Sequence, residues 1–373
     1  MKKIVVMLMV AALAVAAVTG CGAGNGNGGG TASGSADKTA EAQSEAVEET
    51  KEDASEAAEE AKEDVSEAAS EAKEEASEVV EESKEDSAEA DDEENYDTGD
   101  ASKDDPGNKD DIGEKELMVV SFGTSYNDSR RLTIGAIEKA LAEANPDWAV
   151  RRAFTSQIII DHIKKRDNVT IDNVKEALER AEKNGVKELV VQPTHLMDGY
   201  EYNDLMDLLA SYAEAFESVK VGNPLLTSDE DFSKVAEAVY DATKSYDDGK
   251  TAIVFMGHGT EADSNKVYAK MQTVFEDKGY KNHYMGTVEA SPSVEDVIKA
   301  IEGKGYERVV LRPLMVVAGD HANNDMAGDE DDSWKTLFEK AGYKVETIVE
   351  GLGQLEAVQQ MYVDHAGQAM NEK

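Results

Sequence analysis

Short apolar runs rich in strand-forming residues alternate with amphipathic stretches throughout residues 116–373, and this alternation restricts the fold more than any other feature of the chain. The apolar runs predict eight β-strands, at 117–122, 148–154, 188–192, 219–221, 251–256, 284–288, 308–312 and 343–348. The amphipathic stretches predict helices between most of them, including 131–144, 171–183, 232–246 and 294–302. Regular alternation of strand and helix favours an α/β fold with a parallel sheet covered by helices on both faces.

The two halves of this region echo one another in sequence. The first predicted strand ends in Ser-Phe-Gly-Thr at 121–124, and the equivalent strand of the second half ends in Gly-His-Gly-Thr at 257–260. Later strands end at Pro193 and Pro313, and each proline is followed by a glycine six residues on and an asparagine ten residues on. We interpret this pattern as a duplicated α/β unit whose strand-end loops surround one central cleft. The predicted halves are 116–225 and 226–373.

Two of the six histidines follow strands in the second half. His258 lies between two glycines at the end of the strand 251–256, and His321 lies in a polar loop after the strand 308–312. Ligands of open α/β sheets bind at the carboxyl ends of the strands, so both imidazoles are candidate site residues. A histidine in an ordinary glycine turn is the alternative for His258 alone, and the second histidine favours a site.

Carboxylates occupy comparable positions. Glu289 directly follows the strand 284–288, and two imidazoles with one carboxylate suit a borderline divalent ion with coordination positions left open for a substrate. Glu201 lies in the comparable loop of the first half and is expected to face the same cleft. His195 also follows a strand there, whereas His162 and His365 are interpreted as structural or solvent-facing. His283 opens a strand, away from the carboxyl edge, and is expected to have no role in the site.

The beginning of the chain predicts export. Residues 1–20 contain two lysines, an apolar run and small residues, which is typical of a signal peptide. Residues 18–21 read Val-Thr-Gly-Cys and are similar to the lipobox of bacterial lipoproteins, and Cys21 is the only cysteine in the chain. We therefore expect an extracytoplasmic protein anchored to the membrane through a lipid on Cys21, with plain secretion as the alternative.

Residues 22–115 form a low-complexity acidic arm. They contain 33 acidic residues against 8 basic ones, a net charge of −25 within the total of −41. An eleven-residue repeat that begins at each of four lysines places alanine and valine on a narrow helical stripe, which predicts a solvated spacer. The lysines are Lys51, Lys62, Lys73 and Lys84. A helix that binds a partner or a lipid surface is the alternative, although so negative a segment is repelled by anionic lipid.

Several separated motifs after residue 115 resemble the anaerobic sirohydrochlorin cobaltochelatases of the CbiK type. The motifs lie in order at 119–126, 152–156, 254–259, 314–321, 324–327, 332–334 and 351–353. The resemblance implies a class II chelatase fold, with two flavodoxin-like, doubly wound halves and a tetrapyrrole cleft between them.

The resemblance also implies roles for individual residues. His258, His321 and Glu289 match the family's metal ligands, Glu201 matches a glutamate implicated in metal handling, and catalysis would rest on His258, His321 and Glu201. His195 lies in a matching segment, and contact with the substrate, support of the ligands and a structural role all remain open for it.

The implied activity is insertion of Co²⁺ into sirohydrochlorin in the anaerobic pathway of cobalamin biosynthesis, with Fe²⁺ or Ni²⁺ as alternative metals. The metal is a substrate, and no nucleotide cofactor or nucleic-acid partner is expected, while a homo-oligomer is left open. The predicted export favours an alternative function, a lipoprotein that binds haem, another tetrapyrrole or metal for uptake without catalysis.

Overall fold

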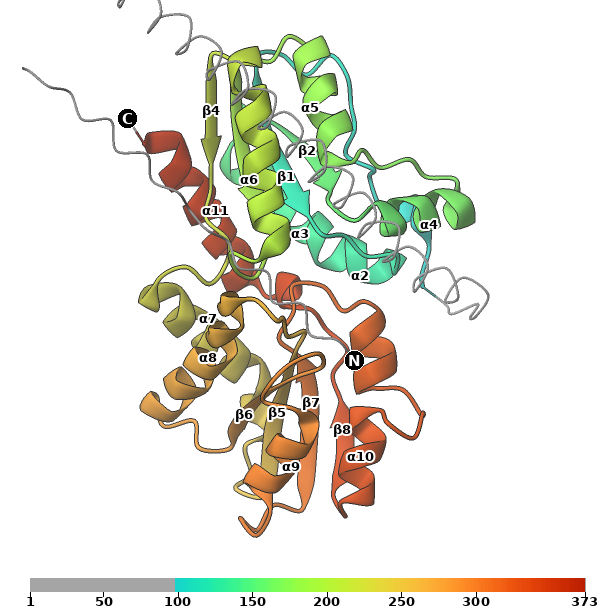
Figure 1. Ribbon diagram of the computed structural model, residues 1–373, viewed down its shortest axis with the longest axis vertical. Helices are drawn as coiled ribbons and strands as arrows, with labels where there is room; N and C mark the ends of the chain where they lie inside the picture. Colours follow the sequence, from blue (N-terminus) through green and yellow to red (C-terminus); the bar gives the residue numbers. More distant parts are fainter. Residues whose placement is uncertain (1–97, 373) are drawn as a thin grey trace, which may run out of the picture. The chain divides into compact units, whose positions relative to one another are not determined.

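A computed structural model describes residues 98–372 of the chain. It contains two four-stranded parallel sheets (Figure 1). The first has the strand order β2-β1-β3-β4, and the second has the order β6-β5-β7-β8. The strands are β1 (Lys115–Ser121), β2 (Ala149–Phe154), β3 (Glu188–Pro193), β4 (Ser218–Val221), β5 (Thr251–Gly257), β6 (His283–Thr287), β7 (Arg308–Pro313) and β8 (Lys344–Thr347). All eight predicted strands are therefore present, and the α/β class is confirmed.

The two sheets repeat each other down to single hydrogen bonds. Each follows the 2-1-3-4 order that begins the flavodoxin-like fold. Thr194 N donates to Val120 O at 2.7 Å beyond β3, and Leu314 N donates to Met256 O at 2.7 Å beyond β7. This repetition supports the interpretation of a duplicated unit.

Helices cover the sheets and connect the strands. In the first half they are α2 (Asn127–Leu132), α3 (Ile134–Ala144), α4 (Gln157–Asp167), α5 (Val174–Lys183) and α6 (Tyr200–Tyr212). In the second half they are α7 (Asp229–Thr243), α8 (Lys266–Asp277), α9 (Val294–Ile301), α10 (Trp334–Lys340) and α11 (Glu356–Asn371). Capping boxes begin α5, α7 and α9. They place the start of α9 at the predicted residue 294, whereas α5 and α7 begin three residues away from the predicted starts at 171 and 232.

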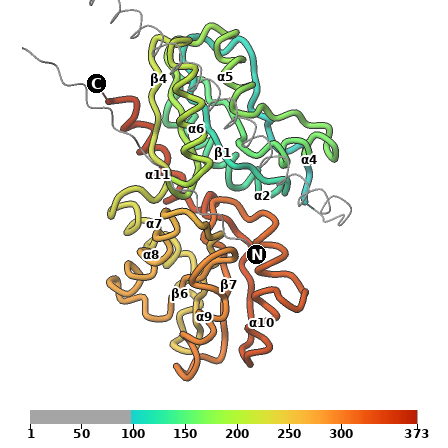
Figure 2. The backbone as a smooth tube through the Cα atoms, in the orientation of Figure 1, coloured from blue at the N-terminus to red at the C-terminus, as the bar shows by residue number. Residues whose placement is uncertain are grey.

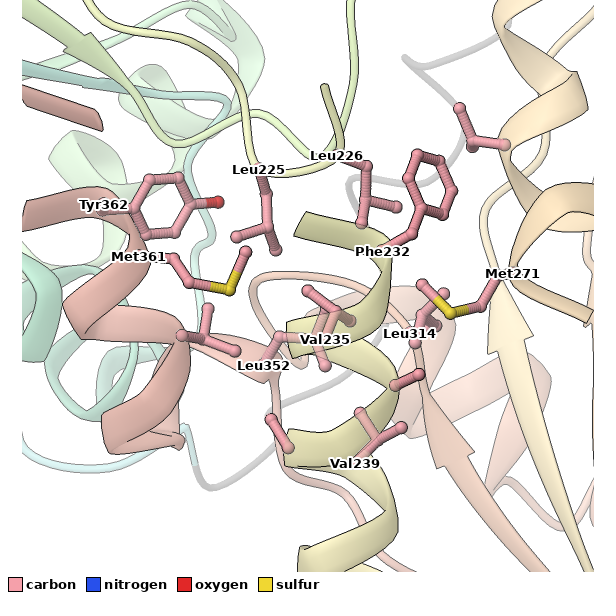
Figure 3. Close-up of a cluster of buried hydrophobic side chains, with 14 of the residues drawn as sticks. Leu225, Leu226, Phe232, Val235, Val239, Met271, Leu314, Leu352, Met361 and Tyr362 are labelled. Atoms are coloured by element: carbon pink, nitrogen blue, oxygen red, sulfur yellow. The ribbon is translucent and has the colours of Figure 1, made fainter. Parts of the chain in front are cut away.

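The last helix joins the two halves. α11 packs on α3, β3 and β4 of the first half as well as on α7, and it lies beside β4 in Figures 1 and 2. Its Tyr362 hydroxyl donates to Thr194 O at 2.9 Å. Tyr362 also belongs to a buried apolar cluster with Leu225, Val235 and Leu352, shown in Figure 3. The division at 225/226 therefore separates the two sheets, but the C-terminal helix contributes to the core of both halves.

Residues 98–114, which composition assigns to the acidic arm, pack against the first half. The Asp104 carboxylate is buried and accepts hydrogen bonds from Arg130 Nε at 2.6 Å and from Arg152 Nη1 at 2.6 Å. Gly107 O accepts from Arg152 N, at the edge strand β2. The folded unit therefore begins upstream of residue 116, because a buried carboxylate between two guanidinium groups fixes this segment. We call residues 98–114 the strap.

None of the helices within residues 98–372 is long and apolar enough to cross a membrane. The predicted signal peptide, Cys21 and the repeats of the arm lie outside the described residues, so export and lipidation remain predictions.

Candidate metal site

Two glycines fix the loop that carries His258. A side chain on Gly257 would collide with the ring of Tyr268, which packs against the end of β5. Gly259 has φ +94°, and a Cβ there would lie 2.8 Å from Ala290 N. Both positions therefore require glycine, and the Gly-His-Gly sequence places a half-exposed imidazole at the carboxyl end of the sheet.

His258 has one ring nitrogen occupied and one available. Nδ1 lies 2.8 Å from Gly259 O, to which it donates, and 3.4 Å from Glu289 Oε2. This arrangement fixes the tautomer that keeps a lone pair on Nε2, the form that binds a metal ion.

Glu289 comes from the neighbouring strand and is tied to the same loop. Its backbone N donates to His258 O at 2.8 Å, directly beyond the end of β6. The side chain is about half exposed, so its carboxylate can reach an ion without displacing a buried partner.

His321 is oriented by the carboxylate of Asp325. It precedes a π-helical turn, η6 (Ala322–Met326), and its Nδ1 lies 2.6 Å from Asp325 Oδ2. The hydrogen bond to Asp325 raises the pKa of His321 above its ordinary value, against the opposing effect of burial. Such a carboxylate–imidazole pair leaves Nε2 free and makes it a stronger ligand.

The three predicted ligands lie together. One ligand atom each from His258, Glu289 and His321 lies within 4.8 Å of the others. The two imidazole rings meet edge to face, with centroids 4.6 Å apart. Three half-exposed side chains on one side would leave coordination positions of a bound ion open, as transfer of the ion to another molecule requires. We call these residues the metal triad.

Glu201 and His195 of the first half are not part of this cluster. Glu201 is exposed in the first turn of α6 and lies outside the three ligand atoms grouped above. Both ring nitrogens of His195 are buried without a hydrogen-bond partner in the described chain, and burial lowers the pKa of His195 to about 4. The ring is therefore neutral at pH 7 and retains one nitrogen able to accept a proton.

The backbone hydrogen bonds that hold the strand-end loops of the metal triad recur in the first half, where the loops carry different side chains. We call this set of strand-end hydrogen bonds and loops the frame of each half. Beyond β2, Thr155 N donates to Ser121 O and Ser156 N donates to Phe122 O, while beyond β6 the corresponding donors are the amides of Val288 and Glu289. Gly123 has φ +106°, close to that of Gly259. Aligning the two units residue by residue places Phe122, Ser156 and Glu201 where the second half has His258, Glu289 and His321.

The loops that carry the two frames touch each other. Ala318 N donates to Ser129 Oγ at 3.0 Å, and a Cβ on Gly319 would lie 3.2 Å from Thr124 Oγ1. The reverse pairing also occurs, since a Cβ on Gly199 would lie 3.9 Å from Ser264 Oγ. The strand-end loops of each half therefore meet those of the other, as a duplicated unit predicts.

The remaining three histidines are either exposed on the surface or buried in the core. His162 is exposed on α4. His283 is buried among the rings of Tyr240, Phe255 and Phe275, and burial lowers its pKa to about 4. His365 is buried on α11, with Nε2 3.1 Å from Asp231 Oδ1, and it fastens α11 to α7.

Three residues that support the site were not predicted. Asp325 could have been found, because it stands four residues after His321 in a polar loop. Ser129 belongs to an Asp-Ser pair that recurs at residues 263–264, but its contact with Ala318, like the packing of Tyr268, depends on the tertiary structure.

A parallel α/β fold with an open cluster of two imidazoles and a carboxylate at a strand edge is the arrangement expected of a metal-handling protein. The sequence profile of the cobalt chelatase (CbiK) family matches residues 115–371. The chain belongs to this family.

Individual relatives agree with that assignment. The chain is 36% identical over 258 residues to a sirohydrochlorin cobaltochelatase of Salmonella typhimurium, covering 69% of this chain and 97% of the relative. It is 29% identical over 260 residues to the sirohydrochlorin cobaltochelatase CbiKC of Nitratidesulfovibrio vulgaris, covering 69% and 91%. Among solved structures, SirB from Bacillus subtilis with Fe³⁺ has a TM-score of 0.50 at 12% identity and covers 69% of this chain and 96% of that one. This last likeness supports the fold alone.

Proposed function

We propose that this protein is a metal chelatase that inserts Co²⁺ into sirohydrochlorin or a closely related tetrapyrrole, as a step of cobalamin biosynthesis. The observation that carries the proposal is the grouping of His258, Glu289 and His321 within 4.8 Å, in a chain of the CbiK family. Both curated relatives described above bear the name of this activity.

The residues of the site suit the chemistry of insertion. The macrocycle must lose two pyrrole protons while the ion moves from protein ligands to four ring nitrogens. Imidazole binds divalent cobalt, and an imidazole that has released the ion can take up a proton near neutral pH. Glu289 balances part of the charge of the ion before transfer.

His195 and Glu201 are proposed to act from the first half. Glu201, exposed in the first turn of α6, is proposed to exchange metal or protons with the triad. His195 is proposed to contact the substrate through the exposed part of its side chain, because both of its ring nitrogens are buried. Carboxylates of the tetrapyrrole must find other partners than the arginines of β2, because Arg151 and Arg152 are buried in ion pairs with Glu116, Asp104 and Glu138.

We also propose that the protein acts outside the cytoplasm, anchored through a lipid on Cys21, and the sequence at residues 1–21 supports this location. Export also favours the second candidate function, capture of a tetrapyrrole or metal without catalysis.

The experiment that tests the function uses the full chain, sirohydrochlorin and Co²⁺, followed by absorption over time, with Fe²⁺ and Ni²⁺ in parallel. Metallation faster than the protein-free rate, and lost in the double variant His258→Ala/His321→Ala, supports the chelatase. Tight binding of the tetrapyrrole without acceleration contradicts it and supports capture.

A further inference from the structure

Three large apolar side chains are exposed where the first sheet ends. The exposed fractions are 48% for Phe122, 55% for Ile158 and 62% for Tyr200. They follow β1, β2 and β3 respectively, which are neighbouring strands. Because adjacent strands lie about 4.8 Å apart, these three strand ends span about 10 Å. Ile158 and Tyr200 lie in the first turns of α4 and α6, the helices that follow β2 and β3, so all three side chains come from segments that follow neighbouring strand ends. Exposed apolar groups that share one edge of a sheet are candidates for a binding surface.

The backbone around Phe122 holds its ring outward. Phe122 O accepts a hydrogen bond from Ser156 N at 3.3 Å, which ties its loop to the end of β2. The next residue, Gly123, has φ +106°, and a Cβ there would lie 2.6 Å from the buried ring of Phe154. The exposure of Phe122 is therefore built into a fixed turn.

This turn also touches the loop of a metal ligand. Thr124, two residues after Phe122, faces Gly319, two residues before His321. Phe122 moreover occupies the position in the first frame that His258 occupies in the second. The first half thus presents an aromatic ring where the second half presents a ligand, and the two loops are in contact.

We infer that Phe122 packs against one face of the tetrapyrrole, with Ile158 and Tyr200 beside it, so that the metal triad delivers its ion from the second half. A flat conjugated macrocycle is the chemical class that an exposed aromatic ring flanked by apolar groups binds well, through offset stacking and burial of apolar area. This inference rests on the proposed function, because the occupant it names is the substrate of that reaction.

The test compares Phe122→Ala with Phe122→Trp and with Leu132→Ala in the full chain. Leu132, the last residue of α2, is a matched apolar side chain with 40% exposure. Binding of metal-free sirohydrochlorin, binding of Co²⁺ followed by its visible absorption, and steady-state metallation are measured for each variant.

In Phe122→Ala we expect the Kd for sirohydrochlorin and its KM to rise about tenfold, while Co²⁺ affinity stays within twofold and kcat changes less than KM. Phe122→Trp should restore both constants, and Leu132→Ala should match the unaltered protein. A loss of folding would instead lower Co²⁺ binding and metallation together.

Two outcomes overturn the inference in different ways. If the unaltered protein metallates sirohydrochlorin and Phe122→Ala has the same Kd and KM, the proposed function stands and the role of Phe122 is wrong. If the unaltered protein neither binds nor metallates sirohydrochlorin, the proposed function fails and the inference fails with it. If the unaltered protein binds sirohydrochlorin without metallating it, the Kd values of the unaltered protein and of Phe122→Ala for sirohydrochlorin still decide the role of Phe122.

Discussion

The first and second sheets share their strand order, their register and the hydrogen bonds at the strand ends, yet only the second presents two imidazoles and a carboxylate together. At the three matching positions the first half has Phe122, Ser156 and Glu201. Duplication thus preserved a backbone frame and allowed its side chains to diverge. One frame carries the three candidate metal ligands, and the other carries an exposed aromatic ring, a serine and a single acid.

The largest effect that tests this division is expected in the matching pair His321→Ala and Glu201→Ala. Removing His321 takes away one of three proposed ligands and should lower Co²⁺ affinity and the rate of metallation by about 10³-fold, the equivalent of several kcal/mol. Removing Glu201, which lies outside the cluster, should lower the rate by about tenfold and leave Co²⁺ affinity unchanged. Titration with Co²⁺ and initial rates measure both. Equal losses of affinity would mean that both halves supply ligands.

The strap gives the first half a feature for which the second half has no counterpart within residues 98–372. Asp104→Asn should lower the free energy of unfolding by about 3 kcal/mol, because it leaves the buried guanidinium of Arg130 without its carboxylate. Asp110→Asn in the same segment removes a half-exposed partner of Arg180 and should cost under about 1 kcal/mol. Urea unfolding of both variants measures the difference. Equal, small effects would show that the strap is not part of the folded unit.

The sequence predicted the strands and the triad for the same reason: both depend on local patterns. Apolar runs ended by glycine or proline mark the strands, and a parallel sheet collects their ends at one edge, so His258, Glu289 and His321 could be brought together without coordinates. The strap could not be predicted, because its composition resembles that of the arm and its attachment depends on tertiary contacts, among them the buried carboxylate of Asp104. The burial of both ring nitrogens of His195 without hydrogen-bond partners could not be predicted either, because it depends on tertiary packing.

A carboxylate that orients a candidate ligand, Asp325 beside His321, is present only in the second half of the two matched loops. Asp325→Asn should weaken Co²⁺ binding by about 10- to 100-fold, because the hydrogen bond at 2.6 Å that orients His321 and increases its basicity is weakened. The exposed acid of the same loop, Asp320, accepts a hydrogen bond from Asn324, and Asp320→Asn provides the control. Competition with a chelator of known affinity measures both variants. If Asp320→Asn weakens binding as much as Asp325→Asn, the effect is one of overall charge.

Lowering the pH should reduce the free energy of unfolding because His195, in the first half, is buried in its neutral form. Its folded-state pKa of about 4 is below the ordinary value, so its contribution to stability is present above about pH 6.5 and is lost as the pH falls from 6.5 toward 4. Between pH 8 and pH 5 this loss amounts to about 2 kcal/mol, which His195→Gln should abolish. Urea unfolding at the two pH values measures it. The parallel variant His283→Gln tests the buried histidine of the second half, and an unchanged pH dependence in His195→Gln would contradict the burial of its nitrogens.

The smallest effect, weak binding of a second Co²⁺, is expected when the three side chains of the metal triad are introduced at the matching positions of the first half. The triple variant Phe122→His, Ser156→Glu and Glu201→His should bind a second Co²⁺, because the backbone hydrogen bonds at the ends of β1 and β2 match those at the ends of β5 and β6. We expect this ion to bind at least about tenfold more weakly than the first, since Leu205 stands where the second half has Asp325, and regular helix α6 replaces the π-helical turn. The variant also loses the side-chain cap of α4 at Ser156, which costs about 1 kcal/mol.

Equilibrium dialysis gives the number of ions bound per chain. Two ions per chain would show that the frame alone is sufficient for metal binding, whereas one ion per chain with the fold intact would mean that the supporting carboxylate, and not the duplicated backbone, distinguishes the two halves.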